Sequence, residues 1–227
     1  RRHSVTELWA ALNAAVDLLW RLDQGLVEII GLSLRVSITA VLAAAVVGFP
    51  LGAWLAMHRF PGRQVCVVVV NALMGLPPVV VGLLVYLLLS RTGPFGVFGL
   101  LFTPTAMIVA QIILVAPIIT ALTRESLEQL SEEYALTLRS LGASRLEQLG
   151  VVLWDGRYML VTALLAGFGR AAAEVGAVMI VGGNIDHLTR VMTTAIALEA
   201  SKGNLSLALG LGMVLLLLSL VVNAGVY

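Results

Sequence analysis

Charge is the first thing that the sequence lacks. Only 12% of the 227 residues are Asp, Glu, Lys or Arg, whereas soluble domains average about 25%. Mean hydropathy is +1.00, and the net charge of +1 leaves no strongly basic surface for nucleic acid. The charge deficit and the long apolar runs together predict a membrane protein with no nucleic-acid partner.

Cysteine and histidine are equally scarce. The single cysteine, Cys66, excludes an internal disulfide and a cysteine-rich metal site. His3, His58 and His187 are scattered, without the spacing of metal ligands. No stretch resembles a Walker A loop, a nucleophile elbow or a paired-carboxylate site. We therefore expect no catalytic residue, no metal and no cofactor in this chain, and no ATP hydrolysis by the chain itself.

Uncharged runs long enough to cross a bilayer recur along the chain. They predict an all-α membrane protein with about five transmembrane helices. The expected spans are residues 36–57, 65–90, 104–122, 158–181 and 205–224, with loops at 91–103 and 182–204.

Two of these spans carry a local irregularity. Gly48 and Gly52 have the spacing that lets two helices approach closely, and Pro50 between them should bend the helix. The second span is interrupted by Gly75-Leu76-Pro77-Pro78. Non-helical backbone at membrane depth survives where it is buried or faces a cavity. The break therefore indicates a pore-lining element or, alternatively, a simple proline kink.

The N-terminal segment differs from the spans. Residues 4–30 are apolar but interrupted by five charged side chains, which are too frequent for a span. We interpret residues 1–30 as an amphipathic segment at the membrane interface. A helix packed on its own protein is the alternative. Residues 31–225 then form the membrane domain.

A polar stretch, residues 127–154, lies between apolar spans. Its apolar residues recur at helical spacing up to Leu141, and Gly142 can then take the left-handed conformation that ends a helix. Ser144 and Glu147 are spaced as a capping box that opens a second helix. We call residues 124–157 the helix–Gly–helix element. Two packed helices at a tight turn are suited to binding a soluble partner.

Basic residues in the loops indicate the orientation of the chain. The side that holds residues 58–64 and 124–157 carries more of them than the side that holds residues 91–103 and 182–204. This excess predicts that the helix–Gly–helix element is cytoplasmic, the N-terminal segment outside and the C-terminus inside.

Two charges fall inside the expected fourth span. Arg170 and Glu174 are four residues apart, so on one helix they would share a face and pair. Ionisable residues at membrane depth are candidate functional sites. A neutralised pair that fixes helix packing is the alternative.

The following loop gathers small and hydroxyl-bearing residues. Gly183, Asn184, Thr189 and Thr193 could solvate an oxyanion through backbone amides and hydroxyls. The same residues could instead form a gate or a cap for an external partner.

The helix–Gly–helix element resembles the cytoplasmic coupling loop of ABC-importer permeases. The signature of that loop is Glu-Ala-Ala, three residues, Gly, nine residues and Ile-x-Leu-Pro. Gly142 takes the place of the glycine, and residues 140–144 read as in many members. Leu136-Thr137-Leu138 occupies the Glu-Ala-Ala positions, Val152 takes the Ile position, and Trp154-Asp155 replaces Leu-Pro. The resemblance implies that the residues that couple to the ATPase are Arg139, Leu141, Gly142, Ala143, Ser144, Arg145 and Glu147.

A second resemblance covers residues 168–204. Phe168-Gly-Arg170, Glu174-Val-Gly-Ala177, Gly183-Asn-Ile185 and Thr189-Arg190 are similar to the molybdate/tungstate permease group. Within that group, residues 189–204 are most similar to the tungstate-type permeases. The span pattern extends this likeness over residues 30–225, and the specific motifs lie within residues 124–204.

The resemblance implies the type I ABC-importer permease fold in a prokaryotic cytoplasmic (inner) membrane. It also implies a homodimer around a pore, two cytoplasmic ABC ATPase subunits that bind ATP, and an external solute-binding protein, all at the lipid bilayer. The cargo it indicates is tungstate, with molybdate or sulfate as alternatives. A secondary transporter that uses Arg170 and Glu174 as an ion site, or a membrane signalling or assembly protein, are the rival classes.

Overall fold

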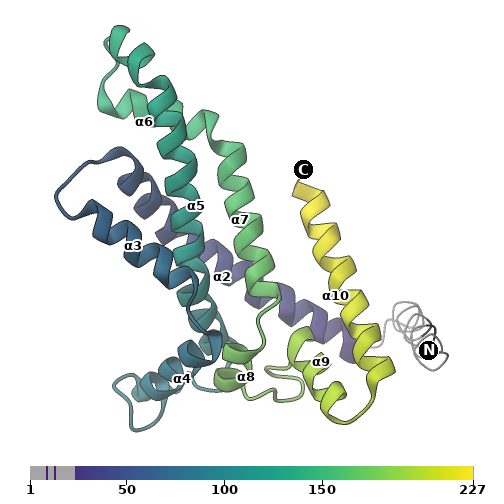
Figure 1. The fold of residues 1–227 in the computed structure, drawn as a ribbon. Helices are drawn as coiled ribbons and strands as arrows, with labels where there is room; N and C mark the ends of the chain where they lie inside the picture. The colour runs from purple at the N-terminus through teal and green to yellow at the C-terminus, as the bar shows by residue number, and fades with distance from the viewer. Residues whose placement is uncertain (1–8, 10–12, 14–23, 227) are drawn as a thin grey trace. The chain divides into compact units, whose positions relative to one another are not determined.

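The computed structural model describes residues 9, 13 and 24–226, and these residues form helices and loops with no β-strand (Figure 1). The elements are α2 (Gln24–Met57), α3 (Arg63–Met74), α4 (Pro78–Leu89), η1 (Gly96–Phe98), α5 (Pro104–Ser140), α6 (Arg145–Asp155), α7 (Arg157–Ala172), α8 (Gly176–Gly182), α9 (Met192–Ser201) and α10 (Leu205–Val226). The expected all-α fold is confirmed.

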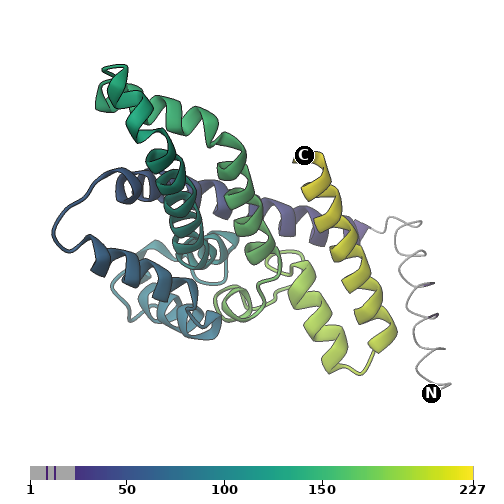
Figure 2. The same cartoon turned by 45° about the horizontal axis from the view of Figure 1, so that its top comes forward.

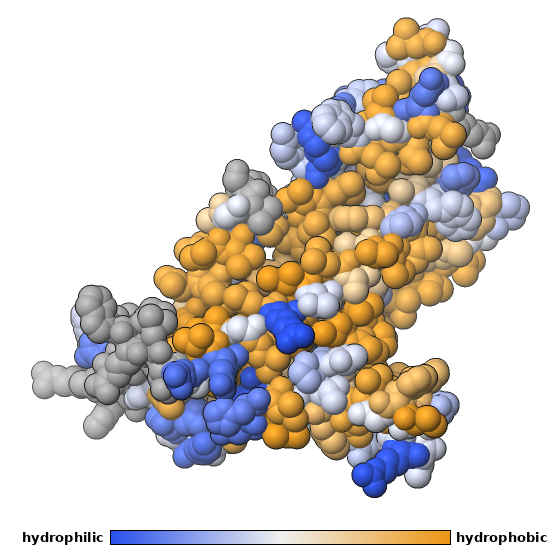
Figure 3. All heavy atoms as spheres, turned by 180° about the vertical axis from the view of Figure 1, so that it is seen from behind, coloured by the Kyte–Doolittle hydropathy of each residue, from blue (hydrophilic) through white to orange (hydrophobic). Residues whose placement is uncertain are grey.

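Helices of membrane-spanning length and composition account for most of the described chain. Three single helices, α2, α5 and α10, qualify, and two bent pairs, α3 with α4 and α6 with α7, raise the count to five if each pair is one span. Figure 3 shows one face of the molecule, on which apolar side chains predominate and hydrophilic side chains form smaller groups. Both observations agree with the membrane protein that the composition predicts.

Helix α5 differs from the prediction in its length. A span at residues 104–122 followed by a separate helix was expected, but α5 is one helix of 37 residues from Pro104 to Ser140. Residues 123–140 contain neither glycine nor proline, so the change from apolar to polar side chains does not interrupt the backbone. The polar helix is therefore a direct extension of the span.

The expected fourth span, residues 158–181, and the loop after it are also corrected. Helix α7 ends at Ala172 and α8 begins at Gly176, so the span is broken at residues 173–175. The expected loop at 182–204 contains the helix α9. Among the described residues of the N-terminal segment, 24–30 belong to α2 and continue directly into the first span. The rest of the amphipathic prediction, apart from residues 9 and 13, lies outside the described residues.

The described chain divides into two compact units, and the first falls within Arg1–Thr39, Pro78–Gln111 and Ala172–Tyr227. In this unit α4 packs against α8, and a Cβ placed on Gly82 would lie 2.7 Å from the Cα of Ala177. Helices α9 and α10 lie side by side (Figures 1 and 2). Leu26 of α2 packs with Met192 and Leu211 in the core of this pair.

The second unit falls within Ala40–Pro77 and Ile112–Ala171. The C-terminal half of α2 approaches α5 where it carries its two spaced glycines. A Cβ on Gly48 would lie 2.8 Å from Cγ2 of Ile119, and a Cβ on Gly52 would lie 2.7 Å from the carbonyl oxygen of Thr120. The close approach that the glycine spacing predicts is thus confirmed.

The glycine contact between α2 and α5 can be tested by adding one methyl group. Gly52→Ala should lower the free energy of unfolding by about 1–3 kcal/mol, because the new Cβ meets backbone rather than a flexible side chain. Gly31→Ala is the matched control on the same helix, since a Cβ there meets nothing within 4 Å and alanine favours helix. Unfolding in mixed detergent micelles, followed by circular dichroism, measures both. Equal effects at the two positions would contradict the packing described here.

Candidate functional site

The end of α5 is closed by a left-handed glycine. Gly142 has φ +74°, and its amide donates to the carbonyl of Arg139 at 3.0 Å. The amide of Ala143 donates to the carbonyl of Leu138, also at 3.0 Å. These two bonds are those of a Schellman motif, which satisfies the free carbonyls at a helix end. The turn predicted at Gly142 is confirmed, and a side chain there would be strained.

Helix α6 begins at once with a capping box. The Ser144 hydroxyl accepts from the Glu147 amide at 3.4 Å, and the Glu147 carboxylate accepts from the Ser144 amide at 2.6 Å. The hydrogen bonds from Ser144 also lower the pKa of Glu147. Arg145 is the first residue of α6. The predicted capping box is therefore confirmed, and the turn between the two helices is hydrogen-bonded on both sides.

The two helices pack against each other at a distance from the turn. Leu127 and Leu130 of α5 and Val152 of α6 form a buried cluster. A Cβ on Gly156 would lie 2.9 Å from Cδ2 of Leu127, so the backbone that links α6 to α7 lies close against α5. The Tyr134 hydroxyl donates to Asp155 at 2.8 Å. The helix–Gly–helix element is thus held together by apolar packing and a hydrogen bond as well as by its turn.

Leucines at the tip of the element point into solvent instead of into this packing. Leu141 is 75% exposed and Leu146 is 80% exposed. The packed cluster lies further from the turn, at Leu127, Leu130 and Val152. Exposed apolar side chains beside a rigid turn are typical of a protein-binding surface.

A charged cluster lies beside this packing, at Glu128. Glu128 of α5 accepts from Arg63 at 2.5 Å through one carboxylate oxygen and from Arg124 at 2.6 Å through the other. Arg63 also donates through Nε to the carbonyl of Leu55 near the end of α2, at 2.8 Å. Each carboxylate oxygen therefore has its own guanidinium, and the cluster joins α5 to α2 and α3.

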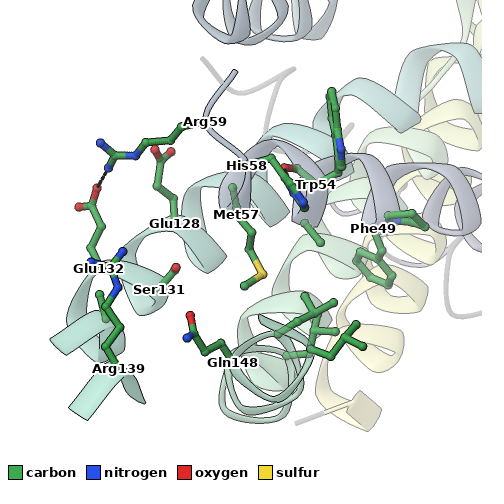
Figure 4. Close-up of a pocket in the computed structure, with 17 residues that line it drawn as sticks. Phe49, Trp54, Met57, His58, Arg59, Glu128, Ser131, Glu132, Arg139 and Gln148 are labelled. Carbon is green, nitrogen blue, oxygen red and sulfur yellow. Dashed lines mark hydrogen bonds and ion pairs between the residues drawn. The ribbon is translucent and has the colours of Figure 1, made fainter. Parts of the chain in front are cut away.

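A pocket of about 990 Å³ opens between the end of α2, α5 and α6 (Figure 4). Trp54 and Leu149 contribute apolar walls, and Glu128 and Arg139 contribute charge. The predicted coupling residue Arg139 therefore lines a cavity that adjoins the tip leucines through Leu146. The pocket and the tip together offer one mixed surface for a partner.

Arg170 and Glu174 do not share a helix. Arg170 lies in the last turn of α7, and Glu174 lies in the break before α8. The helical-face argument for their pairing is therefore wrong. Glu174 is only 3% exposed, and its carboxylate accepts from the amide of Ala177 at 2.9 Å, which caps the start of α8. Its backbone carbonyl accepts from the Thr193 hydroxyl at 2.8 Å. These bonds replace the helical ones and explain the break.

The residues proposed for an oxyanion path take largely structural positions. Gly183 has φ +73° and ends α8, and Asn184 follows with φ +51°. The buried Thr189 hydroxyl donates to the carbonyl of Gly182 at 2.6 Å and accepts from the Ile185 amide at 2.9 Å. With Thr193 also donating to backbone, both hydroxyl protons are engaged within the chain. A direct role in binding an oxyanion stays a prediction.

The same loop is tied to the start of α2. His187 contacts Glu28 through Nδ1 at 2.7 Å, and this hydrogen bond raises the pKa of His187. The contact is strongest when His187 is protonated, so it is lost as the pH rises through that raised pKa. Among the described residues, no group of His, Cys, Asp or Glu could hold a metal ion.

Residues 48–227 match the family described as the inner membrane component of binding-protein-dependent transport systems. The chain belongs to this family. A probable anion ABC transporter permease protein from Haloferax volcanii is 43% identical over 204 residues, which cover 88% of each chain. A tungstate uptake system permease protein from Peptoclostridium acidaminophilum is 42% identical over 95% of this chain and 94% of its own. A protein of the same description from Campylobacter jejuni is 37% identical over 95% and 90%.

Family membership fixes the setting of the site. This permease is an integral protein of the inner membrane that crosses the bilayer more than once, and its relatives are permease components rather than catalytic subunits. The expected permease family, the expected all-α membrane fold and the expected location in the inner membrane are therefore confirmed. The coupling roles of the individual site residues stay predictions.

Sequence reasoning missed two features of the site. The first is Leu136, which is 82% exposed near the end of α5 and extends the apolar tip. The sequence gave no indication of this, because Leu136 does not belong to the apolar stripe of the helix. The second is the contact between Arg63 and Glu128, which joins residues 65 positions apart. Only the pairing of Arg124 with Glu128, at i and i+4, was visible in the sequence.

The capping box can be tested directly. Ser144→Ala should destabilise the first turn of α6 by about 1 kcal/mol, because the amide of Glu147 loses the hydroxyl that accepts from it. Hydrogen exchange of the α6 amides measures this loss. Ser140→Ala is the control on the other side of the turn, since its hydroxyl only donates back to the carbonyl of Thr137. Equal loss of protection in both variants would show that the cap is not responsible.

Proposed function

We propose that this permease is the pore-forming subunit of an ATP-driven tungstate importer. The helix–Gly–helix element binds a cytoplasmic ABC ATPase, and the chain itself holds no cofactor. The observation that carries the proposal is the tip of the element, where exposed Leu141 and Leu146 flank a turn closed by a Schellman motif and a capping box. Two of the relatives are tungstate uptake permeases, and they indicate the cargo.

The element has the mechanical properties that such a role requires. Its two helices are packed through Leu127, Leu130 and Val152, and its turn is fixed by hydrogen bonds. A partner that seats on the tip would therefore move α5 and α6 as one body. Because α5 continues without interruption into its apolar half, that movement reaches the membrane-spanning part of the same helix. ATP binding and hydrolysis on the partner would supply the work.

The membrane path is expected to form between two copies of the chain. Each copy has non-helical breaks at residues 75–77 and 173–175, within apolar sequence. Such breaks are tolerated where the backbone is buried in protein or lines a cavity. The buried polar contacts of Glu174 and Thr193 satisfy the second break. We expect the two copies to form a homodimer around a pore. A solute-binding protein on the outer side fits the name of the family.

Selectivity is expected to lie mainly with the binding protein. The hydroxyls of Thr189 and Thr193 donate to backbone carbonyls, so they offer no concentrated set of donors for an anion. The alternative cargoes are molybdate and sulfate, which share the tetrahedral shape and the charge of tungstate. Comparison of binding proteins loaded with each anion, in a transport assay, separates these possibilities. A secondary transporter that uses Arg170 and Glu174 would need no ATPase at all.

The proposal predicts that charge at the tip prevents assembly. Leu141→Arg should weaken binding of the ATPase at least tenfold, because an apolar contact is replaced by a charge that would be buried at the interface. Gln129→Arg, on an exposed position of α5 away from the turn, is the matched control and should bind as the wild type does. Copurification from membranes and affinity measurement in detergent test this. Unchanged affinity in Leu141→Arg would contradict the proposed docking surface.

A further inference from the structure

We propose that Glu128 is a positioning residue that carries the movement of the helix–Gly–helix element sideways into α3. The inference rests on the proposed function, because it needs an ATPase that moves the element. It concerns the charged cluster of Arg63, Arg124 and Glu128, which we call the Glu128 cluster. The cluster lies outside the turn and outside the predicted coupling residues.

The hydrogen bonds of the cluster connect three helices. Arg63, the first residue of α3, donates through Nη2 to Glu128 on α5 at 2.5 Å. The same guanidinium donates through Nε to the carbonyl of Leu55 on α2 at 2.8 Å. Arg124, one turn before Glu128 on α5, donates to the second carboxylate oxygen at 2.6 Å. One arginine therefore joins the start of α3 to α5 and to the last turns of α2.

The position of Glu128 on α5 suits it to transmit movement. It lies 12 residues before Ser140, where the helix ends, which corresponds to about 18 Å along the axis. No glycine or proline lies between these two residues, so this part of the helix has no ready point of bending. Leu127, next to Glu128, is fully buried against α6. A displacement at the turn therefore reaches Glu128, and Arg63 passes it to α3.

Burial distinguishes this cluster from an ordinary surface pair. The side chains of Arg63, Arg124 and Glu128 are only 16%, 17% and 23% exposed. The neighbouring ion pair joins Arg59, between α2 and α3, to Glu132 on α5 at 3.3 Å. Its side chains are 84% and 65% exposed. Exposed pairs are screened by water and contribute little, whereas a half-buried carboxylate between two arginines is hard to replace. If Glu128 were neutral, the guanidinium groups of Arg63 and Arg124 would repel each other with no negative charge between them.

The arrangement also separates the roles of the two arginines. Arg63 joins α5 to another helix, whereas Arg124 contacts Glu128 within α5 itself. If the cluster acted only through the charge balance at Glu128, loss of either arginine should matter alike. If it transmits movement, only the link through Arg63 is needed. This difference makes the inference testable with variants that remove the same charge.

The native cysteine provides the probe. Cys66 is the only cysteine in the sequence, is exposed, and lies three residues after Arg63 on α3. A spin label on Cys66, in the permease reconstituted with its ATPase, reports how α3 responds when a non-hydrolysable ATP analogue and Mg²⁺ are added. The measured quantity is the change caused by the nucleotide, so a local effect of each substitution on the label cancels. Uptake per ATP hydrolysed is measured in parallel.

We expect Arg63→Gln and Glu128→Gln to reduce the nucleotide response at Cys66 at least threefold, and uptake per ATP hydrolysed by a similar factor. ATPase binding should persist, because the tip is untouched. Arg124→Gln and the exposed-pair control Glu132→Gln should keep the wild-type response. Arg63→Gln combined with Glu128→Gln should lose no more than either variant alone. If Glu128→Gln fails to assemble, Arg63→Gln alone still tests the inference, because it removes the same contact between α3 and α5.

A wild-type response in Arg63→Gln, with the ATPase bound, would overturn the inference while leaving the proposed function intact. Equal losses in Arg63→Gln and Arg124→Gln would overturn it as well, since they would show a cluster that acts only through the charge balance at Glu128. If the wild-type permease neither binds the ATPase nor responds to nucleotide, the proposed function itself fails, and the inference falls with it.

Discussion

The continuity of helix α5 is the constraint on which the rest of the structure depends. Apolar residues at its start suit a bilayer and charged residues at its end suit water, yet the backbone runs unbroken from Pro104 to Ser140. The helix stops only where Gly142 takes a left-handed conformation and Ser144 caps the next helix. A break in the helix where the side chains change from apolar to polar would have let the polar element move independently of the span. Because α5 has no such break, the polar element is rigidly joined to the span.

Around this helix the chain uses small residues where backbones must meet and polar residues where backbones must break. Gly52 lets α2 approach α5, and Gly156 lets the start of α7 approach it. Glu174 and Thr193 supply the hydrogen bonds that the broken backbone between α7 and α8 gives up. In a bilayer, each unsatisfied backbone group would be costly, so these contacts are as necessary as the helices themselves.

Local chemistry explains what could be predicted from the sequence. The turn at Gly142, the capping box and the interruption before Pro78 depend on residues adjacent in the chain, and all three were found. The end of α7 could not be predicted, because it depends on a hydrogen bond from Thr193 across 19 residues. The link from Arg63 to Glu128 is likewise a tertiary contact. The exposure of the tip leucines could not be predicted either, because helical periodicity shows which face is apolar but not whether another part of the protein covers it.

The central claim is that this permease moves tungstate only when an ATPase works on its helix–Gly–helix element. Proteoliposomes that contain the permease, its ATPase and tungstate-loaded binding protein test it most directly, with accumulated tungsten measured by elemental analysis. We expect uptake that requires ATP on the side of the membrane where the ATPase is bound, and that stops when the ATPase is omitted. Uptake that persists without ATP and follows an ion gradient would contradict it.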